Sequence, residues 1–199
     1  MKRIYAFDFD GTLTTRDTLL EFIRYACGTK LFIYGFLRHA HLLVLMKFGL
    51  YPNWKVKQRI FSYFFKGLDI GAFNFLCQNF ATDNRQLLRP KGLQKLGQAQ
   101  AEGAEVLIVS ASIDNWVQPF FPQFKVLGTQ VEVQDGHLTG RFLTSNCYGQ
   151  EKVNRILALY PHREGYELIA FGDSRGDREL LTFADEAYYK PFCDSNRGN

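Results

Sequence analysis

Two aspartates, Asp8 and Asp10, directly follow a short apolar run at residues 4–7, near the start of the 199-residue chain. Because side chains alternate along a strand, carboxylates two positions apart leave its end on the same side. One such carboxylate can attack phosphorus and form an acyl phosphate, while the other donates and later accepts a proton. The pattern predicts phosphoryl transfer, with Asp8 as the nucleophile and Asp10 as the general acid and base. A solvated acidic turn is the plainer alternative, but such a turn needs no buried strand in front of it.

Asp173 and Asp177 follow another apolar run, at residues 168–171, so that four carboxylates could meet at one site. Such a concentration of negative charge is unstable without a cation. Ligand sets made only of oxygen atoms favour Mg²⁺. We therefore expect Mg²⁺ to be bound directly by Asp8, Asp173 and the backbone carbonyl of Asp10. Asp177 would support these ligands.

Two further side chains could contact the transferred phosphoryl group. Ser110 follows the apolar run at residues 105–109, and Lys152 lies near the start of a predicted helix at residues 150–159. A hydroxyl donor and a cation suit the equatorial oxygens of a phosphoryl group. Taken alone, Ser110 is an ordinary turn residue and Lys152 a lysine on a solvated helix face. Their order along the chain, together with the aspartates, favours the functional interpretation.

These side chains have to be brought together by the elements that carry them. Buried strands are predicted at residues 4–7, 105–109 and 168–171, with helices between them. This alternation predicts an α/β fold with a doubly wound parallel sheet. Ligands of such sheets lie outside the carboxyl ends of the strands, which is where the polar side chains fall. Further predicted elements are helices at residues 91–102 and 178–183, a hairpin at 129–142 turning at Asp135-Gly136, and an edge strand at 186–189.

Residues 15–88 differ from the rest of the chain, because Leu, Phe, Lys and Gln recur there at helical spacing without strand-like runs. Thr18 and Glu21 fit a capping box at the start of a first helix, which Gly28 would end. The predicted helices cover residues 19–27, residues 31–48, a segment that begins at Asn53, and residues 69–88. We expect them to form a helical cap domain, residues 15–88, inserted into a core domain made of residues 1–14 and 89–199.

Composition narrows the remaining classes of function. With 46% hydrophobic and 22% charged residues, the chain has the balance of an ordinary globular protein. A net charge of +4 suits small anionic substrates and is too weak to argue for nucleic acid. The cysteines show neither disulfide nor zinc spacing, and no signal-peptide pattern precedes the first strand, so we expect a cytoplasmic protein. Charges interrupt the most apolar stretch, residues 31–50, so a membrane-spanning helix is not expected.

The motif Asp8-Phe9-Asp10-Gly11-Thr12 resembles the first motif of the haloacid dehalogenase superfamily of aspartyl-phosphate-forming phosphatases. The superfamily's remaining motifs are matched, in order, by Ser110, Lys152, and the pair Asp173 and Asp177. The resemblance implies a Rossmann-like core, a Mg²⁺ cofactor and hydrolysis of a phosphate monoester, with Gly11 and Thr12 also contacting the phosphate. Dehalogenases of the family lack an acidic residue two positions after the nucleophile, so Asp10 favours a phosphatase.

The helical insertion after the first motif is similar to the C1 cap of subfamily IB, the phosphoserine phosphatase branch. The segments Val109-Ser110-Ala111-Ser112 and Gly149-Gln150-Glu151-Lys152 also look like that branch. Asp17 lies where phosphoserine phosphatases carry a glutamate that contacts the substrate's amino group, and it could equally cap a helix. Two departures count against phosphoserine itself. Ala111 and Ser112 replace two glycines, and the fourth motif reads Gly-Asp-Ser-Arg-Gly-Asp.

A second resemblance bears on the substrate. Residues 22–25, the long apolar second helix and residues 147–152 are similar to type C bacterial phosphatidylglycerophosphatases, which implies a lipid phosphate at the inner membrane face. The aromatic residues of the cap, with Lys47, Lys55 and Arg59, would then meet anionic lipids. We favour a small phosphorylated metabolite as the partner, with the aromatics as the core of the cap and the cations as its solvated face. A binding protein without catalysis is a further alternative, which the intact set of catalytic residues disfavours.

Overall fold

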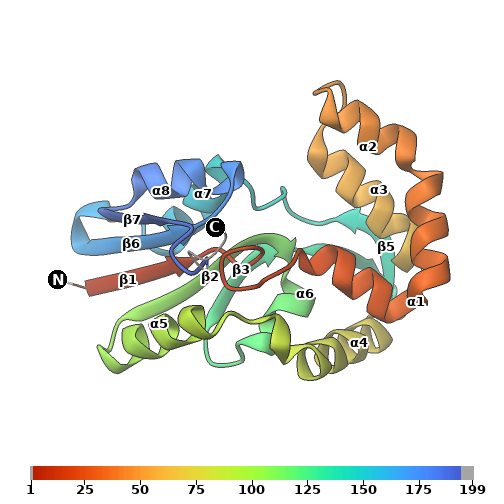
Figure 1. The fold of residues 1–199 in the computed structure, drawn as a ribbon. Helices are drawn as coiled ribbons and strands as arrows, with labels where there is room; N and C mark the ends of the chain where they lie inside the picture. The colour runs from red at the N-terminus through yellow and green to blue at the C-terminus, as the bar shows by residue number, and fades with distance from the viewer. Residues whose placement is uncertain (1, 194–199) are drawn as a thin grey trace, which may run out of the picture.

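The computed structural model describes residues 2–193 (Figure 1). In this part of the chain, five strands form one parallel sheet in the order β3-β2-β1-β6-β7. Their bounds are β1 Lys2–Phe7, β2 Glu105–Ile113, β3 Lys125–Thr129, β6 Tyr166–Gly172 and β7 Glu186–Tyr189. The strand order reverses between β1 and β6, as in other doubly wound α/β folds. The predicted fold class is confirmed, while the last residues of the predicted core range, 194–199, lie outside the described part.

β1 is buried on both faces because its side chains are apolar on both. Helices cover the sheet from each side: α5 Pro90–Ala101 on one, and α7 Gln150–Leu159 with α8 Arg178–Phe183 on the other (Figure 1). Ile4 and Ala6 pack in the core beneath α7 and α8. Tyr5 and Phe7 pack in the core beneath α5, and the Phe7 ring stacks on Phe171 of β6 with centroids 4.4 Å apart. β1 is therefore packed on both faces up to Phe7, the residue that precedes Asp8.

Between β1 and β2 the chain forms helices that extend to one side of the sheet, on the right in Figure 1. They are α1 Thr18–Arg38, α2 Ala40–Lys47, α3 Asn53–Phe65 and α4 Ile70–Asp83, followed by the 3₁₀ turn η1 Arg85–Leu87. Gly28 has a non-helical backbone (φ 77°, ψ 162°) that divides α1 into two helical segments at a kink, so the first segment ends there as predicted. The predicted helix at residues 31–48 is interrupted at His39, the residue that ends α1. The Nδ1 atom of His39 lies 2.8 Å from the Gly35 carbonyl in the last turn of α1.

Aromatic side chains fill the space between these helices and α6 Asp114–Val117, which follows β2. Phe22 of α1 stacks on Trp116 of α6 with ring centroids 4.9 Å apart. The core interpretation holds for the buried aromatics of this region, which include Phe22, Phe61, Phe65, Phe73 and Phe80. It does not hold for Phe48 and Phe75, whose exposed fractions are 74% and 63%. Within residues 2–193, no helix is both long and apolar enough to cross a bilayer.

The predicted hairpin is present as β4 Val131–Gln134 and β5 His137–Phe142. Its turn residues, Asp135 and Gly136, both have positive φ (50° and 78°), as a tight hairpin turn requires. Backbone hydrogen bonds fasten the hairpin to the α3–α4 connection: Gly67 N–H donates to Leu138 O (2.8 Å), and Leu138 N–H donates to Leu68 O (2.9 Å). The hairpin therefore ties α3 to the segment that follows β3. The remaining turns are η2 Gln118–Phe120, η3 Arg163–Gly165 and η4 Arg175–Asp177.

Candidate active site

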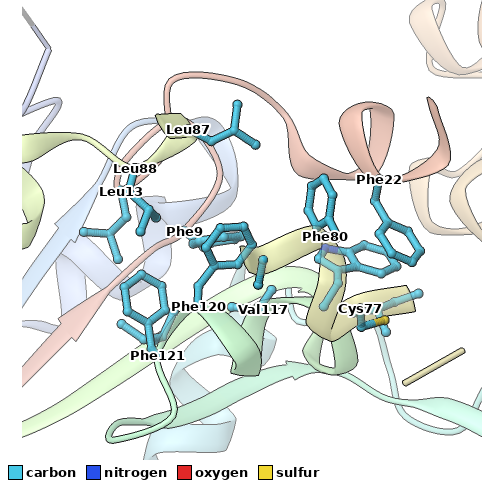
Figure 2. Packing of buried hydrophobic residues seen from close by; sticks show 14 of the residues in the cluster. Phe9, Leu13, Phe22, Cys77, Phe80, Leu87, Leu88, Val117, Phe120 and Phe121 are labelled. Carbon is cyan, nitrogen blue, oxygen red and sulfur yellow. The ribbon is translucent and has the colours of Figure 1, made fainter. Parts of the chain in front are cut away.

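The loop after β1 carries Asp8 and Asp10 on one side and Phe9 on the other. Phe9 is fully buried and packs against Phe120 and Phe121, with ring centroids 5.5 and 5.8 Å away (Figure 2). Because the side chain between the two aspartates is anchored in the core, both carboxylates are directed to the carboxyl end of the sheet. The predicted orientation of the pair follows from this alternation.

Lys152, in the first turn of α7, joins two of the predicted site carboxylates. Its Nζ donates to Asp8 Oδ1 (2.6 Å), to Asp177 Oδ1 (2.6 Å) and to the Val109 carbonyl (2.8 Å). Those three bonds use the three protons of an ammonium group, and only 1% of Lys152 is exposed. Lys152 is therefore a buried cation fixed beside Asp8 and not a lysine on a solvated helix face.

Burial and charge together perturb the ionisation of this cluster. Burial raises the pKa of Asp8 to about 7, a rise that Lys152 limits and Asp177 reinforces. Burial disfavours the charged form of Lys152, but the negative charges of Asp8 and Asp177 favour that form more strongly and raise the Lys152 pKa. Burial similarly opposes the charge of Asp177, but Lys152 and Ser174 hold its pKa below the usual range. The ammonium group and the Asp177 carboxylate therefore form the fixed ion pair, and Asp8 is the group poised to exchange a proton.

Thr12 and Gly11 bring Asp173 up to Asp8. The Thr12 hydroxyl lies 3.0 Å from Asp8 Oδ2 and 3.3 Å from Asp173 Oδ1. Gly11 has a φ of 82°, and a Cβ atom on it would come within 2.4 Å of Asp173 Oδ2. Glycine is therefore required at position 11 both by the backbone conformation and by the close approach of a carboxylate.

The oxygen atoms of Asp8, Asp173 and Asp177 fit a divalent cation. One ligand atom from each residue lies within 4.8 Å of the others. Asp177 Oδ2 already accepts from the backbone N–H groups of Asp173 (3.1 Å) and Ser174 (3.0 Å), so Asp177 is held in a supporting place. Lys152 forms ion pairs with only two of these three carboxylates, and burial followed by the Asp177 charge raises the pKa of Asp173. A divalent cation held by oxygen atoms would balance this excess of negative charge.

Asp10 is held apart from that cluster by residues that the sequence did not single out for this purpose. Its Oδ1 accepts from the Thr18 backbone N–H (2.7 Å) and the Thr18 hydroxyl (2.6 Å), and its Oδ2 accepts from the Ser112 hydroxyl. Trp116 Nε1 in turn donates to the Thr18 hydroxyl (3.2 Å). The side chain predicted as the general acid is thus fixed between the start of α1 and the end of β2.

Thr18 is consequently not the residue that caps α1, and the predicted capping box is wrong. Asp17 is the cap, because its Oδ1 accepts from the backbone N–H groups of Leu19 (2.9 Å) and Leu20 (3.3 Å). Asp17 also lines the active-site cavity, so the same side chain can cap α1 and lie next to a bound substrate.

Ser110 lies within β2 and not after it, because the strand continues to Ile113. The Ser112 N–H donates to Ser110 Oγ (3.0 Å), and the Thr129 hydroxyl of β3 donates to the Ala111 carbonyl (2.9 Å). The pairing of Ile113 with Thr129 of β3 extends the sheet beyond the apolar run, and Ser110 is buried beside the cavity. Sequence pattern alone could not show that extension, since the bonding partners come from another strand.

A cavity of about 340 Å³ opens above the carboxylates. Its inner end is lined by polar side chains, among them Asp8, Asp10, Ser110 and Lys152. Its outer wall is apolar and is formed by residues of α1, α2 and α3, among them Leu19, Leu20, Phe36, Leu43 and Met46. The arrangement suits a small anionic group at the inner end and an apolar group at the wall.

Lys57 of α3 is the cation that this wall contributes, and the sequence analysis did not identify it. Its Nζ donates to the Ala111 carbonyl (2.5 Å). Burial lowers the pKa of Lys57, although Asp10 and Asp17 pull in the opposite direction. In the sequence, Lys57 is one of several lysines and arginines between residues 55 and 66, and no motif distinguished it from them.

A parallel sheet with carboxylates, a buried lysine and serines at its carboxyl end defines an α/β enzyme site. The profile of the family described as haloacid dehalogenase-like hydrolase matches residues 5–182. The chain therefore belongs to the haloacid dehalogenase-like hydrolase family.

The chain is also similar to individual proteins. The chain is 32% identical to Protein CicA of Caulobacter vibrioides, over 95% of this chain and 86% of that protein. Among solved structures, a protein of unknown function from Bordetella pertussis Tohama I has a TM-score of 0.80 at 18% identity, covering 92% of this chain and 88% of the other. A phosphoserine phosphatase from T. onnurineus has a TM-score of 0.62 at 20% identity, covering 95% and 84%. These two structures show a shared fold.

Proposed function

We propose that the protein is a Mg²⁺-dependent phosphatase that hydrolyses a phosphate monoester through an aspartyl phosphate on Asp8. The observation that carries this proposal is the contact of Asp8 with Lys152 and Thr12 at the inner end of a cavity that Asp10 also lines. A nucleophile, a second carboxylate and a fixed cation are thereby placed around a space that can hold a phosphate group. The similarity to phosphoserine phosphatases in fold is consistent with this reaction.

In the first half of the reaction, Asp8 attacks phosphorus and the bond from phosphorus to the leaving oxygen breaks. Asp10 donates its proton to that oxygen, so the product leaves as a neutral alcohol. The Lys152 ammonium group lies beside the attacking carboxylate and stabilises charge there. Ser110 accepts a bond from a backbone N–H, which leaves its hydroxyl proton available to a phosphoryl oxygen.

In the second half, Asp10 removes a proton from water as the water attacks phosphorus, and the bond to Asp8 breaks to release phosphate. Held by Asp8, Asp173 and the Asp10 carbonyl, with Asp177 behind them, Mg²⁺ would supply positive charge to the phosphoryl oxygens. Thr12 and Gly11 keep Asp173 close to Asp8 for that purpose.

We assign residues 15–88 to a subfamily IB-type C1 cap, and residues 1–14 and 89–199 to the core domain. The support is the placement of the cavity, whose inner end comes from the sheet and whose outer wall comes from α1, α2 and α3. In this arrangement the cap excludes water from the reaction and selects the leaving group. Asp17 and Lys57 are the charged residues that this cap contributes to the lining of the cavity.

Hydrolysis of an aryl phosphate, measured with Mg²⁺ and with EDTA, tests the proposed reaction. We expect Mg²⁺-dependent turnover that Asp8→Asn abolishes. The matched control is Asp135→Asn, an aspartate in the hairpin turn, which should retain full activity. If the intact chain hydrolyses no phosphomonoester with Mg²⁺, it is a binding protein that retains the fold without the reaction.

The apolar wall supports a second candidate, a lipid phosphate as the substrate. Leu43 and Met46 of α2 bring hydrocarbon to the cavity, which a small polar metabolite would not use. A phosphometabolite screen that includes phosphoserine, a lysophospholipid phosphate and phosphatidylglycerophosphate distinguishes the two. A higher kcat/KM for the lipids would assign the site to lipid phosphates, and a higher value for polar metabolites would reject that candidate.

A further inference from the structure

The charge of the chain is concentrated in one segment. Residues 22–68 contain no aspartate or glutamate, and their eight cations are Arg24, Lys30, Arg38, Lys47, Lys55, Lys57, Arg59 and Lys66. The rest of the chain contains 16 lysines and arginines and 20 acidic residues, so its net charge is negative. A net charge of only +4 therefore conceals a strongly basic part, which comprises most of α1 together with α2 and α3.

The same segment exposes large apolar side chains. Ile33, Leu37, Val44, Phe48 and Leu50 are each more than half exposed, and Leu37, Phe48 and Leu50 reach 70% or more. No residue of α2 is buried, and α2 belongs to the group of helices that extends away from the sheet (Figure 1). Scattered exposed leucines are ordinary, but a concentration of apolar side chains on adjacent helices marks an interaction surface.

A second cavity, of about 390 Å³, lies within this segment and is lined mainly by potential donors to an anion: Arg38, His39, His41, Tyr51, Arg59 and Tyr63. Within the described residues, neither Arg38 nor Arg59 forms an ion pair, and the nearest acidic residues in sequence are outside the segment. Two unpaired guanidinium groups around one hollow form a site suited to a phosphate group. We call this hollow the basic pocket.

We propose that α1, α2 and the start of α3 dock on an anionic phospholipid bilayer, with a headgroup phosphate in the basic pocket. Cations and exposed hydrocarbon on the same helices are what an interfacial helix needs to bind such a surface. A nucleic acid or an acidic protein would match the charge of the segment but would leave Phe48 and Leu50 without a partner. The bilayer matches both features.

Docking in this way does not depend on the proposed hydrolysis. It would place the apolar wall of the active-site cavity close to the bilayer, because α1 and α2 contribute Phe36, Leu43 and Met46 to that wall. The exposed residues Leu37 and Val44 of the same helices do not line that cavity. A loss of docking and a loss of catalysis can therefore be measured separately.

Co-sedimentation with vesicles tests the proposal. We expect the protein to bind vesicles of phosphatidylcholine with phosphatidylglycerol, to bind phosphatidylcholine alone much more weakly, and to dissociate at high salt. The double variant Arg38→Ala/Arg59→Ala should lower the partition coefficient about 30-fold, since each cation near an anionic surface contributes roughly a factor of 5. Phe48→Ser should lower it about 10-fold through the loss of buried hydrocarbon.

Two variants serve as matched controls. Phe75→Ser removes a comparably exposed aromatic (63%) from α4, and Lys125→Glu reverses an exposed cation at the start of β3. Both should bind anionic vesicles as the parent does, and all variants should keep the parent's hydrolysis of a soluble aryl phosphate. Equal binding to neutral and anionic vesicles, or unchanged binding by the Arg38 and Arg59 variant, would overturn the proposal. A dimer in light scattering that Phe48→Ser dissociates would instead assign the surface to a second copy of the chain.

Discussion

Lys152 illustrates how one buried side chain can organise several others. Its ammonium group holds Asp8 and Asp177 at 2.6 Å each, and without it these two carboxylates would be buried with no cation between them. Breaking a buried ion pair by removing one partner typically costs about 3–5 kcal/mol. The lysine therefore stabilises the folded site as well as serving the proposed reaction.

The pKa of Asp8 leads to a prediction about pH and Mg²⁺. Burial raises this pKa from 3.8 to about 7, so in the metal-free protein the stabilising contribution of protonated Asp8 is fully present below 3.8 and is lost as the pH rises through 7. Because Mg²⁺ has to displace that proton, it should bind more tightly as the pH rises. We expect Mg²⁺ to raise the Tm more at about pH 8 than at about pH 6.

The control for this prediction is Asp173→Asn, which removes a proposed ligand and should abolish the Mg²⁺-induced rise at both pH values. A rise in Tm of the same size at both values in the parent protein would contradict the link to Asp8. Thermal unfolding followed by circular dichroism, with EDTA as the reference, provides the measurement.

Ser112 should act as a positioning residue for Asp10. Its hydroxyl donates to Asp10 Oδ2, so Ser112→Ala frees one side of the carboxylate that would deliver the proton. We expect kcat to fall about 10- to 100-fold, the value of one hydrogen bond to a charged group, with little change in KM. Steady-state kinetics on an aryl phosphate would show this split.

Ser145→Ala is the matched control for Ser112→Ala, because Ser145 is an exposed serine in the loop before α7. It should leave kcat unchanged. A rise in KM without a fall in kcat for Ser112→Ala would show that Ser112 binds substrate and does not position Asp10.

At the scale of elements, the contact between the β4–β5 hairpin and α3 fixes the outer wall of the cavity. Gly140 of β5 has a φ of 82°, and a Cβ atom there would lie 2.5 Å from Ser62 Oγ of α3. Gly140→Ala should therefore lower the free energy of unfolding by about 1–3 kcal/mol and raise KM, because α3 carries Lys57. Urea denaturation and kinetics on the same preparation measure both effects.

Gly97→Ala is the matched change in an ordinary helix. Gly97 lies within α5 with open space where a Cβ atom would go, so alanine should stabilise the protein by roughly 0.5–1 kcal/mol. If Gly140→Ala were equally harmless, the hairpin would not restrain α3.

Sequence patterns predicted well those elements whose signals are local. The helix Gln150–Leu159, the helix Arg178–Phe183 and the edge strand Glu186–Tyr189 have the predicted bounds, because periodicity and Gly or Asp caps define them within a few residues. The strand β3 was missed, because Lys125–Thr129 is short and only partly buried, and it pairs with β2 alone.

The residues of the candidate site also differ in whether sequence patterns could predict them. Asp8, Asp173 and Asp177 meet as expected, because the ends of parallel strands lie at one edge of the sheet, and Lys152 joins them from the first turn of α7. Thr18, Ser112 and Lys57 were not foreseen as partners of this site, because their roles depend on how α1 and α3 fold back over the sheet. Spacing along a chain carries no information about such tertiary placement.

At the scale of the whole molecule, the end of the described chain packs against its beginning. Phe192 is 8% exposed and stacks on Phe171 and Phe7, with ring centroids 5.6 and 6.4 Å away. The segment after β7 thus covers the face of the sheet that β1 and β6 share. This closure links the C-terminal part to the strand that carries Asp8.

Phe192→Ala should lower the free energy of unfolding by about 3 kcal/mol, the lower end of the cost for removing a buried phenylalanine. Tyr189→Ala is the control, because Tyr189 is an aromatic residue 61% exposed on the neighbouring strand and its loss should change stability little. Equal stability of the two variants in urea denaturation would show that the terminal segment contributes nothing to the fold.

The bonds between Thr18 and Asp10 join the first residue of α1 to the proposed proton donor. A rotation of the helices that admitted a substrate would therefore also turn the carboxyl group that has to protonate it. Proton delivery by Asp10 would therefore require α1 to lie against the loop after β1, where these two bonds are formed.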